Sequence, residues 1–154
     1  MKFKAPMLVV TNMENSKKFY KEVLGLRVTA DFGANVTLRG GVSLQTADSW
    51  AEFINQPEDE FGWGGNVFEL YFEEDDLDAF IEKLSSMKIH YLHDLKEQPW
   101  GQRAVRFYDP DSHIIEVGEP LKAVCLRFIA QGMTPEQVAN RMDVPQRLID
   151  SFLK

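Results

Sequence analysis

The apolar positions at the start of the chain predict a strand followed by a helix. The run MLVVT, from Met7, is short and rich in β-branched residues, which is typical of a strand. Residues 12–24 then place apolar side chains on one helical face, at Phe19, Tyr20, Val23 and Leu24. Asn12 or Asn15 can cap this helix and Gly25 can end it.

Three short strands are predicted next, with the sequences RVTADF, NVTLRG and GVSLQTA. The paired glycines Gly40 and Gly41 indicate a hairpin turn between the second and third of them. Residues 47–65 mix aromatic and acidic residues with Pro and three glycines. This composition favours a loop that contains a single helical turn.

The second half of the chain repeats this order. Residues 66–74, NVFELYFEE, alternate strictly and predict a strand, and residues 75–88, DDLDAFIEKLSSMK, have the pattern of a capped amphipathic helix. IHYLHDL and the stretch EQPWGQRAVRFYDPDSHIIEVGEP add three strands, the last two joined by the turn residues Asp109, Pro110 and Asp111. The pattern therefore predicts an α+β fold in which a βαβββ unit is used twice.

The end of the chain has no strand signal. Gly132 can end a helix over AVCLRFIAQ, Thr134 can cap PEQVANRM, and Pro145 can open QRLIDSFLK. We therefore expect two parts, a domain over residues 1–119 and a helical extension over residues 120–154. The last two helices faintly resemble a DNA-binding helix-turn-helix, but Arg147 and Lys154 give the second helix little positive charge. A helical cap on the domain is the favoured interpretation.

Composition excludes several classes of protein. No apolar run is long enough to span a bilayer, and the N-terminus does not read as a signal peptide, so a cytoplasmic location is expected. The single cysteine, Cys125, excludes a disulfide framework and a thiolate zinc cluster within one chain. It lies in an apolar helical pattern, which favours a packed core thiol over a nucleophile.

The charge is unevenly distributed, with a net value of −7 for the whole chain. Residues 1–120 hold 12 Lys and Arg against 21 Asp and Glu, whereas residues 121–154 hold 5 against 3. The acidic main body would repel polyphosphate, which disfavours nonspecific binding of nucleic acid.

Glu116 is a carboxylate in the otherwise apolar strand HIIEV. A buried carboxylate is costly unless it is paired, so Glu116 is a candidate metal ligand, a partner of a substrate, or half of an ion pair. Glu69 on the strand NVFELYFEE raises the same question. The candidate partners for a purely structural ion pair are Arg39, Arg103 and Arg106.

The repeated βαβββ order, the segment NMENSKKFYKEVLGLRV and above all WGQRAVRFYDPDSHIIEVGEP resemble the vicinal oxygen chelate superfamily. That group includes glyoxalase I, bleomycin-resistance proteins and extradiol dioxygenases. The resemblance covers residues 1 to about 120 and implies two modules that form a half-open, barrel-like cavity. It also implies a homodimer and a small-molecule ligand, with no membrane partner.

In metal-using relatives the ligands come from the first and last strand of each module, which here implies Ala5, Gln45, Glu69 and Glu116. We expect Glu69 and Glu116, one from each half of the duplicated sheet, to converge in a shared cavity as catalytic residues. Ala5 replaces the expected His, so the remaining trio offers only oxygen ligands. Such a trio favours Mn²⁺ or Mg²⁺ over Zn²⁺ or Ni²⁺, or no metal at all.

Histidines do not complete this trio. His90 and His93 lie on opposite faces of one predicted strand, and His113 follows the turn and is expected to face water. Aromatic residues on loops often line ligand pockets, although packing in the core or at a dimer interface is an equally good explanation. The candidate pocket residues are Trp50, Phe53, Phe61, Trp63, Tyr71, Trp100 and Arg103.

Two functions remain open at this level. One is a metal-dependent lyase or isomerase that acts on a small carbonyl substrate, with Glu116 and Glu69 holding the metal and moving a proton. The other is a metal-free protein that sequesters an aromatic or cationic small molecule. The absence of an imidazole at Ala5 favours the hypothesis of a binding protein, whereas the presence of Glu116 favours the hypothesis of an enzyme. A third hypothesis is a regulator whose ligand controls the C-terminal helices.

Overall fold

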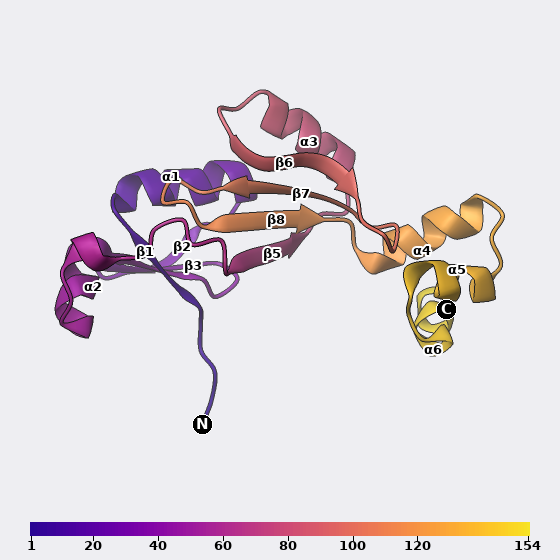
Figure 1. The fold of residues 1–154 in the computed structure, drawn as a ribbon, viewed down its shortest axis with the longest axis horizontal. Coiled ribbons are helices and arrows are strands. Elements are labelled where there is room, and N and C mark those ends of the chain that lie inside the picture. The colour runs from indigo at the N-terminus through magenta and orange to yellow at the C-terminus, as the bar shows by residue number, and fades with distance from the viewer. The chain divides into compact units, whose positions relative to one another are not determined.

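The computed structural model describes all 154 residues and divides them into two compact units (Figure 1). Unit 1 contains residues 1–68 and 108–114, and unit 2 contains residues 69–107 and 115–154. None of the helices combines the length and the apolar character that are needed to cross a membrane.

Unit 1 contains the first predicted βαβββ module. Its strands are β1 (Met7–Val10), β2 (Val28–Asp31), β3 (Asn35–Leu38) and β4 (Ser43–Thr46), and helix α1 (Met13–Leu24) follows β1. The sheet has the order β1-β4-β3-β2, in which β1 runs parallel to β4 and the other neighbours are antiparallel. These elements confirm the strand and helix predictions for residues 7–46.

The ends of α1 follow from side-chain chemistry. Asn12 caps the helix by accepting a hydrogen bond from the backbone N–H of Asn15. Gly25 ends it in the left-handed conformation, which a residue without a Cβ adopts at little cost. Tyr20 and Val23 are buried on one face, as the apolar spacing predicts.

The prediction of a loop with one helical turn over residues 47–65 is wrong. Ala47–Ile54 form a complete helix, α2, and Glu58–Glu60 form a short 3-10 helix, η1. Ala47, Trp50 and Ile54 have helical spacing, and Asn55 ends α2 in the left-handed conformation. The Pro and glycines that suggested a loop all lie after this helix.

Unit 2 contains the second module. Its strands are β5 (Glu69–Glu73), β6 (His90–Glu97), β7 (Arg103–Tyr108) and β8 (Ile114–Gly118), and helix α3 (Leu77–Ser85) is capped by Asp76. The sheet has the order β5-β8-β7-β6. β5 is shorter than predicted because Asn66, Val67 and Phe68 precede it, and Asn66 has a positive φ of 52° that interrupts extended structure.

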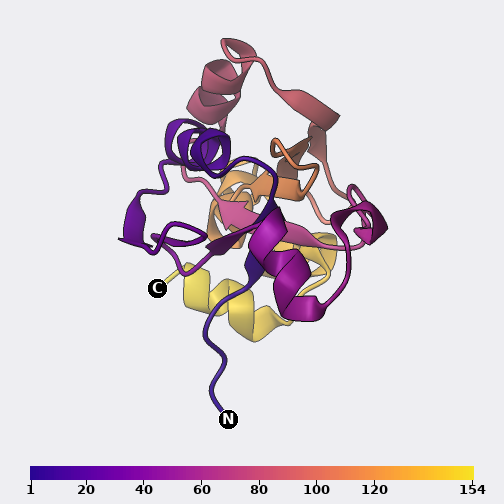
Figure 2. The same cartoon turned by 90° about the vertical axis from the view of Figure 1, so that its left-hand side faces the viewer.

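Three short helices complete unit 2, as predicted: α4 (Leu121–Ala130), α5 (Pro135–Met142) and α6 (Gln146–Phe152). Figures 1 and 2 show them gathered into one cluster. Their own apolar core consists of Val124, Cys125, Phe128, Val138, Ala139, Met142 and Ile149. Cys125 is therefore a buried core thiol, as predicted, and burial raises its pKa.

Two arginines of these helices bind the turn between β6 and β7. Arg127 donates to the carbonyl of Gly101 at 2.6 Å and to the carboxylate of Glu119 at 3.0 Å, and Arg141 pairs with Glu97 at 3.1 Å. Burial acts to raise the pKa of Glu119, but the backbone N–H of Arg103 and the guanidinium groups of Arg103 and Arg127 outweigh it and hold the pKa below its ordinary value. The helices therefore dock onto the sheet of unit 2 through ionic contacts as well as packing.

Candidate functional site

Glu69, Arg106 and Glu116, which we call the Arg106 cluster, meet on three strands of the second sheet. Glu69 begins β5, Glu116 lies on the neighbouring strand β8, and Arg106 lies on β7 beyond it. The Arg106 Nε donates to Glu69 Oε2 at 2.9 Å, and its Nη2 forms an ion pair with Glu116 Oε2. One guanidinium group therefore serves both carboxylates, which is the structural pairing that the sequence left open.

Burial dominates the electrostatics of Glu116, whose side chain is only 6% exposed. Loss of water raises the pKa of Glu116, Arg106 opposes that shift, and the nearby Glu69 adds to it. The net direction is upward, so the folded protein holds the Glu116 proton more tightly than an exposed glutamate would.

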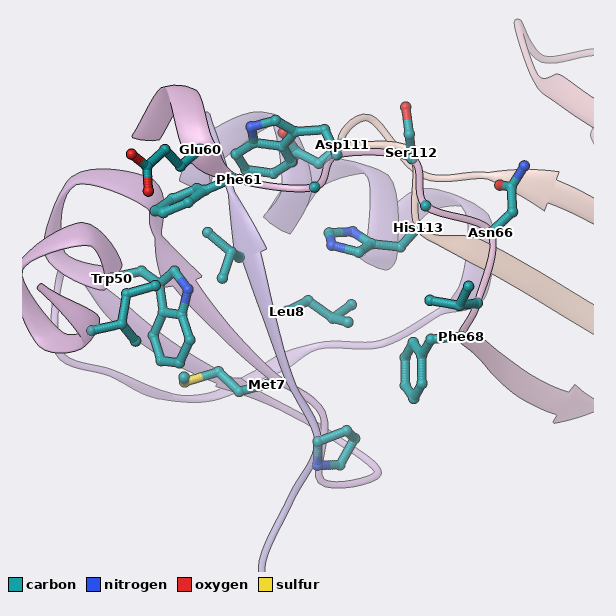
Figure 3. Close-up of a pocket in the computed structure, with 18 of the residues that line it drawn as sticks. Met7, Leu8, Trp50, Glu60, Phe61, Asn66, Phe68, Asp111, Ser112 and His113 are labelled. Atoms are coloured by element: carbon teal, nitrogen blue, oxygen red, sulfur yellow. The ribbon is translucent and has the colours of Figure 1, made fainter. Parts of the chain in front are cut away.

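A cavity of about 560 Å³ lies in unit 1, between β1, α2 and the segments that follow α2 and β7 (Figure 3). We call it the β1–α2 cavity. Trp50 of α2, Phe61 and Trp63 contribute aromatic walls, and Met7 and Leu8 of β1 contribute aliphatic ones. A cavity of this size, with apolar walls and with polar side chains that include Asn66, Ser112 and His113, suits a small organic molecule.

The predicted pocket residues do not form one group. Trp50, Phe61 and Trp63 line the β1–α2 cavity, whereas Phe53 is 68% exposed and does not. Tyr71 and Trp100 line a separate groove of about 390 Å³ in unit 2. Arg103 is held by Asp78 and Glu119 in ion pairs of 2.8 and 2.6 Å.

Sequence reasoning missed one of the polar side chains that line the β1–α2 cavity. The prediction that His113 faces water is wrong: its side chain is 20% exposed and lines the cavity (Figure 3). Its Nδ1 is 2.8 Å from Asp109 Oδ2, which also accepts a 2.8 Å hydrogen bond from the hydroxyl of Tyr20. The only sequence signal for this arrangement was the turn motif DPDSH.

The rest of that motif ties the turn into unit 1. Asp111 Oδ1 accepts hydrogen bonds from the backbone N–H and the hydroxyl of Thr11, and its Oδ2 accepts one from Ser16. Both acidic residues of the motif are buried and fully engaged. The motif therefore fixes the position of His113 relative to β1 and α1.

A model of the glyoxalase-like domain matches residues 3–122. The chain belongs to the glyoxalase-like domain family. This confirms the resemblance to the vicinal oxygen chelate superfamily, whose two-module arrangement the two sheets share. The matched segment ends two residues into α4, so most of the helical extension lies beyond the family domain.

Known relatives of the family domain include proteins without an assigned function. The chain is 26% identical over 126 residues to the uncharacterized protein YraH of Bacillus subtilis (strain 168), covering 76% of this chain and 97% of that protein. It is also 38% identical to a protein of unknown function from Agrobacterium tumefaciens whose crystal structure is known. The two structures superpose with a TM-score of 0.71, and the match covers 78% of this chain and 94% of that chain.

A lactoylglutathione lyase from Agrobacterium tumefaciens is also similar in structure. It is 22% identical, with a TM-score of 0.61, and the likeness covers 78% of this chain and 94% of that one. At this identity the comparison shows a shared fold.

The residues do not fit the divalent metal that the family implies. The prediction that each half of the duplication supplies one carboxylate is wrong, because Glu69 and Glu116 belong to the same sheet. Gln45 lies in unit 1, where Asn35 donates to its amide oxygen and its amide nitrogen donates to Ser49. Ala5 precedes β1, and no three His, Cys, Asp or Glu side chains form a group that could hold a metal ion.

A guanidinium cation already pairs with the two carboxylates that the predicted metal would need. For Glu69 and Glu116 to bind Mn²⁺ or Mg²⁺, Arg106 would have to leave both of them. The metal site over Glu69, Glu116 and Gln45 therefore stays a prediction that this arrangement does not favour.

Proposed function

We propose that this protein binds a small aromatic molecule in the β1–α2 cavity and does so without a metal. The observation that carries the proposal is the aromatic lining of that cavity by Trp50, Phe61 and Trp63. Two of these rings pack on each other at a centroid distance of 5.8 Å, which gives the wall a defined shape. The pairing of Glu69 and Glu116 with Arg106 supports the metal-independent form of the function.

The cavity can be tested with 2-methoxynaphthalene, a neutral aromatic probe, on protein treated with EDTA. Trp63→Ala removes an aromatic wall, and we expect it to weaken binding by about fivefold in equilibrium dialysis, because stacking on an aromatic side chain contributes on the order of 1 kcal/mol. Phe53→Ala is the matched control, since Phe53 shares α2 with Trp50 but lies outside the cavity. If both variants lost the same affinity for the probe, the probe would not bind in the β1–α2 cavity.

A metal-dependent lyase or isomerase is the second candidate function. The observation that favours it is the convergence of Glu69 and Glu116, together with the raised pKa of Glu116.

Titration with Mn²⁺, Ni²⁺ and Zn²⁺ in a calorimeter separates the two functions. Under our proposal we expect no stoichiometric binding of any of the three ions at this site, because Arg106 already occupies both carboxylates as their ion-pair partner. Stoichiometric metal that is lost in the Glu116→Gln variant would establish the second candidate instead.

A further inference from the structure

His113 presents one unused ring nitrogen at the β1–α2 cavity. Its Nδ1 lies against Asp109, and its Nε2 makes no hydrogen bond within the chain. Figure 3 shows the imidazole ring directed into the space above Leu8. Polar side chains such as Asn66 and Ser112 also line this cavity, and the unused Nε2 of His113 offers a hydrogen-bond acceptor to a ligand that lies against the ring.

Asp109 determines which nitrogen carries the proton. Its carboxylate accepts from the Tyr20 hydroxyl and from the backbone N–H groups of Asp111 and His113, at 2.8 to 2.9 Å. Burial and the nearby Asp109 raise the pKa of Tyr20, so its hydroxyl keeps its proton and remains a donor. A carboxylate that only accepts hydrogen bonds holds neutral His113 in the Nδ1–H tautomer, which leaves the Nε2 lone pair open to the cavity.

The charges around the cavity narrow the ligand class. No Lys or Arg lines the cavity, whereas Glu60 does, so a ligand with a permanent negative charge would find no fixed cation there. The Asp111 carboxylate also lines the cavity, but it already accepts hydrogen bonds from Thr11 and Ser16. A neutral aromatic molecule that carries a hydroxyl group satisfies both the apolar walls and the free lone pair.

We infer that the ligand of the β1–α2 cavity is a phenol, whose ring packs against the aromatic wall and whose hydroxyl donates a hydrogen bond to Nε2 of His113. This inference rests on the proposed function, because it concerns the same cavity. Asp109 and Tyr20 act as positioning residues: they hold the tautomer and the ring but do not touch the ligand.

The matched probes are 2-naphthol and its methyl ether 2-methoxynaphthalene, in which a methyl group replaces the hydroxyl hydrogen and removes the donor for Nε2. At about pH 8, where an ordinary histidine is neutral, we expect the wild-type protein to bind 2-naphthol about tenfold more tightly. His113→Phe keeps a planar ring and removes both nitrogens, and it should abolish this preference, so that the two probes bind with similar affinity.

His113→Asn guards against a variant that fails to fold. An Asn side chain can still donate to Asp109 but presents no ring nitrogen to the cavity, so it should also abolish the preference. Circular dichroism establishes that each variant is folded. Wild-type protein that binds both probes equally, or variants that keep the preference, would overturn the phenol inference alone. Failure to bind either probe would overturn the proposed function with it.

Discussion

Replacing Arg106 with Met is expected to lower the free energy of unfolding by about 2 to 3 kcal/mol at neutral pH. The variant keeps much of the aliphatic stem but leaves the buried Glu116 carboxylate without its cation. We place the loss at the low end for a broken buried pair because Arg106 is 25% exposed and water can partly replace it. Urea denaturation followed by circular dichroism measures the change.

The pH dependence of this loss has a definite sign. The pKa of folded Glu116 is raised, so its carboxylate form costs stability as pH rises through that pKa, and removing Arg106 raises the pKa further. The Arg106→Met defect should therefore be smaller at about pH 4, where glutamate is largely protonated in both states.

Glu116→Gln in the Arg106→Met background provides the control. It removes the unpaired charge and should recover part of the lost stability at neutral pH. If the double variant were less stable than Arg106→Met, the burial of an uncompensated Glu116 charge could not be the cause of the defect.

Gly101→Ala is expected to lower the free energy of unfolding by about 3 kcal/mol, from overpacking and backbone strain together. A Cβ at Gly101 would lie 2.6 Å from Cε2 of Phe128 and closer still to its Cζ. The ring cannot move aside easily, because it is buried in the helical core and lies beneath the guanidinium groups of Arg127 and Arg141 at 5.0 and 5.3 Å. Thermal and urea unfolding measure the loss.

Gly41→Ala is the matched control for the clash. Gly41 and Gly101 share a φ of +90°, but a Cβ at Gly41 meets nothing within 4 Å. Its replacement should therefore cost only the backbone strain, about 1 kcal/mol. Similar losses at the two glycines would show that Phe128 does not restrict Gly101.

Local patterns predicted most of the fold because the signals lie within each element. Asn12 and Gly25 delimit α1, and Thr134 forms a capping box with Gln137 at the start of α5. The prediction failed at α2, where the Pro, Gly and acidic residues of the following segment concealed a short amphipathic helix. When the composition of residues 47–65 is judged as a whole, it cannot separate the eight helical residues from the loop that follows them.

The site was less predictable because it depends on which strands are neighbours. The sequence indicated that Glu116 needs a partner and named Arg106 among three arginines, but only the order of β5, β8 and β7 shows that Arg106 also contacts Glu69. His113 escaped prediction because its turn belongs to unit 1, although the strands on either side belong to unit 2. No local pattern reports such a long-range placement.

That placement means that the repeat in the sequence is not a pair of separable fragments. A polypeptide ending at residue 68 would lack residues 108–114, so Tyr20 would bury its hydroxyl without the Asp109 acceptor, and Thr11 and Ser16 would lose Asp111. A split version of this protein would have to add the peptide 108–114 back to its first piece. Residues 108–114, which come from the second half of the sequence, therefore complete the first unit.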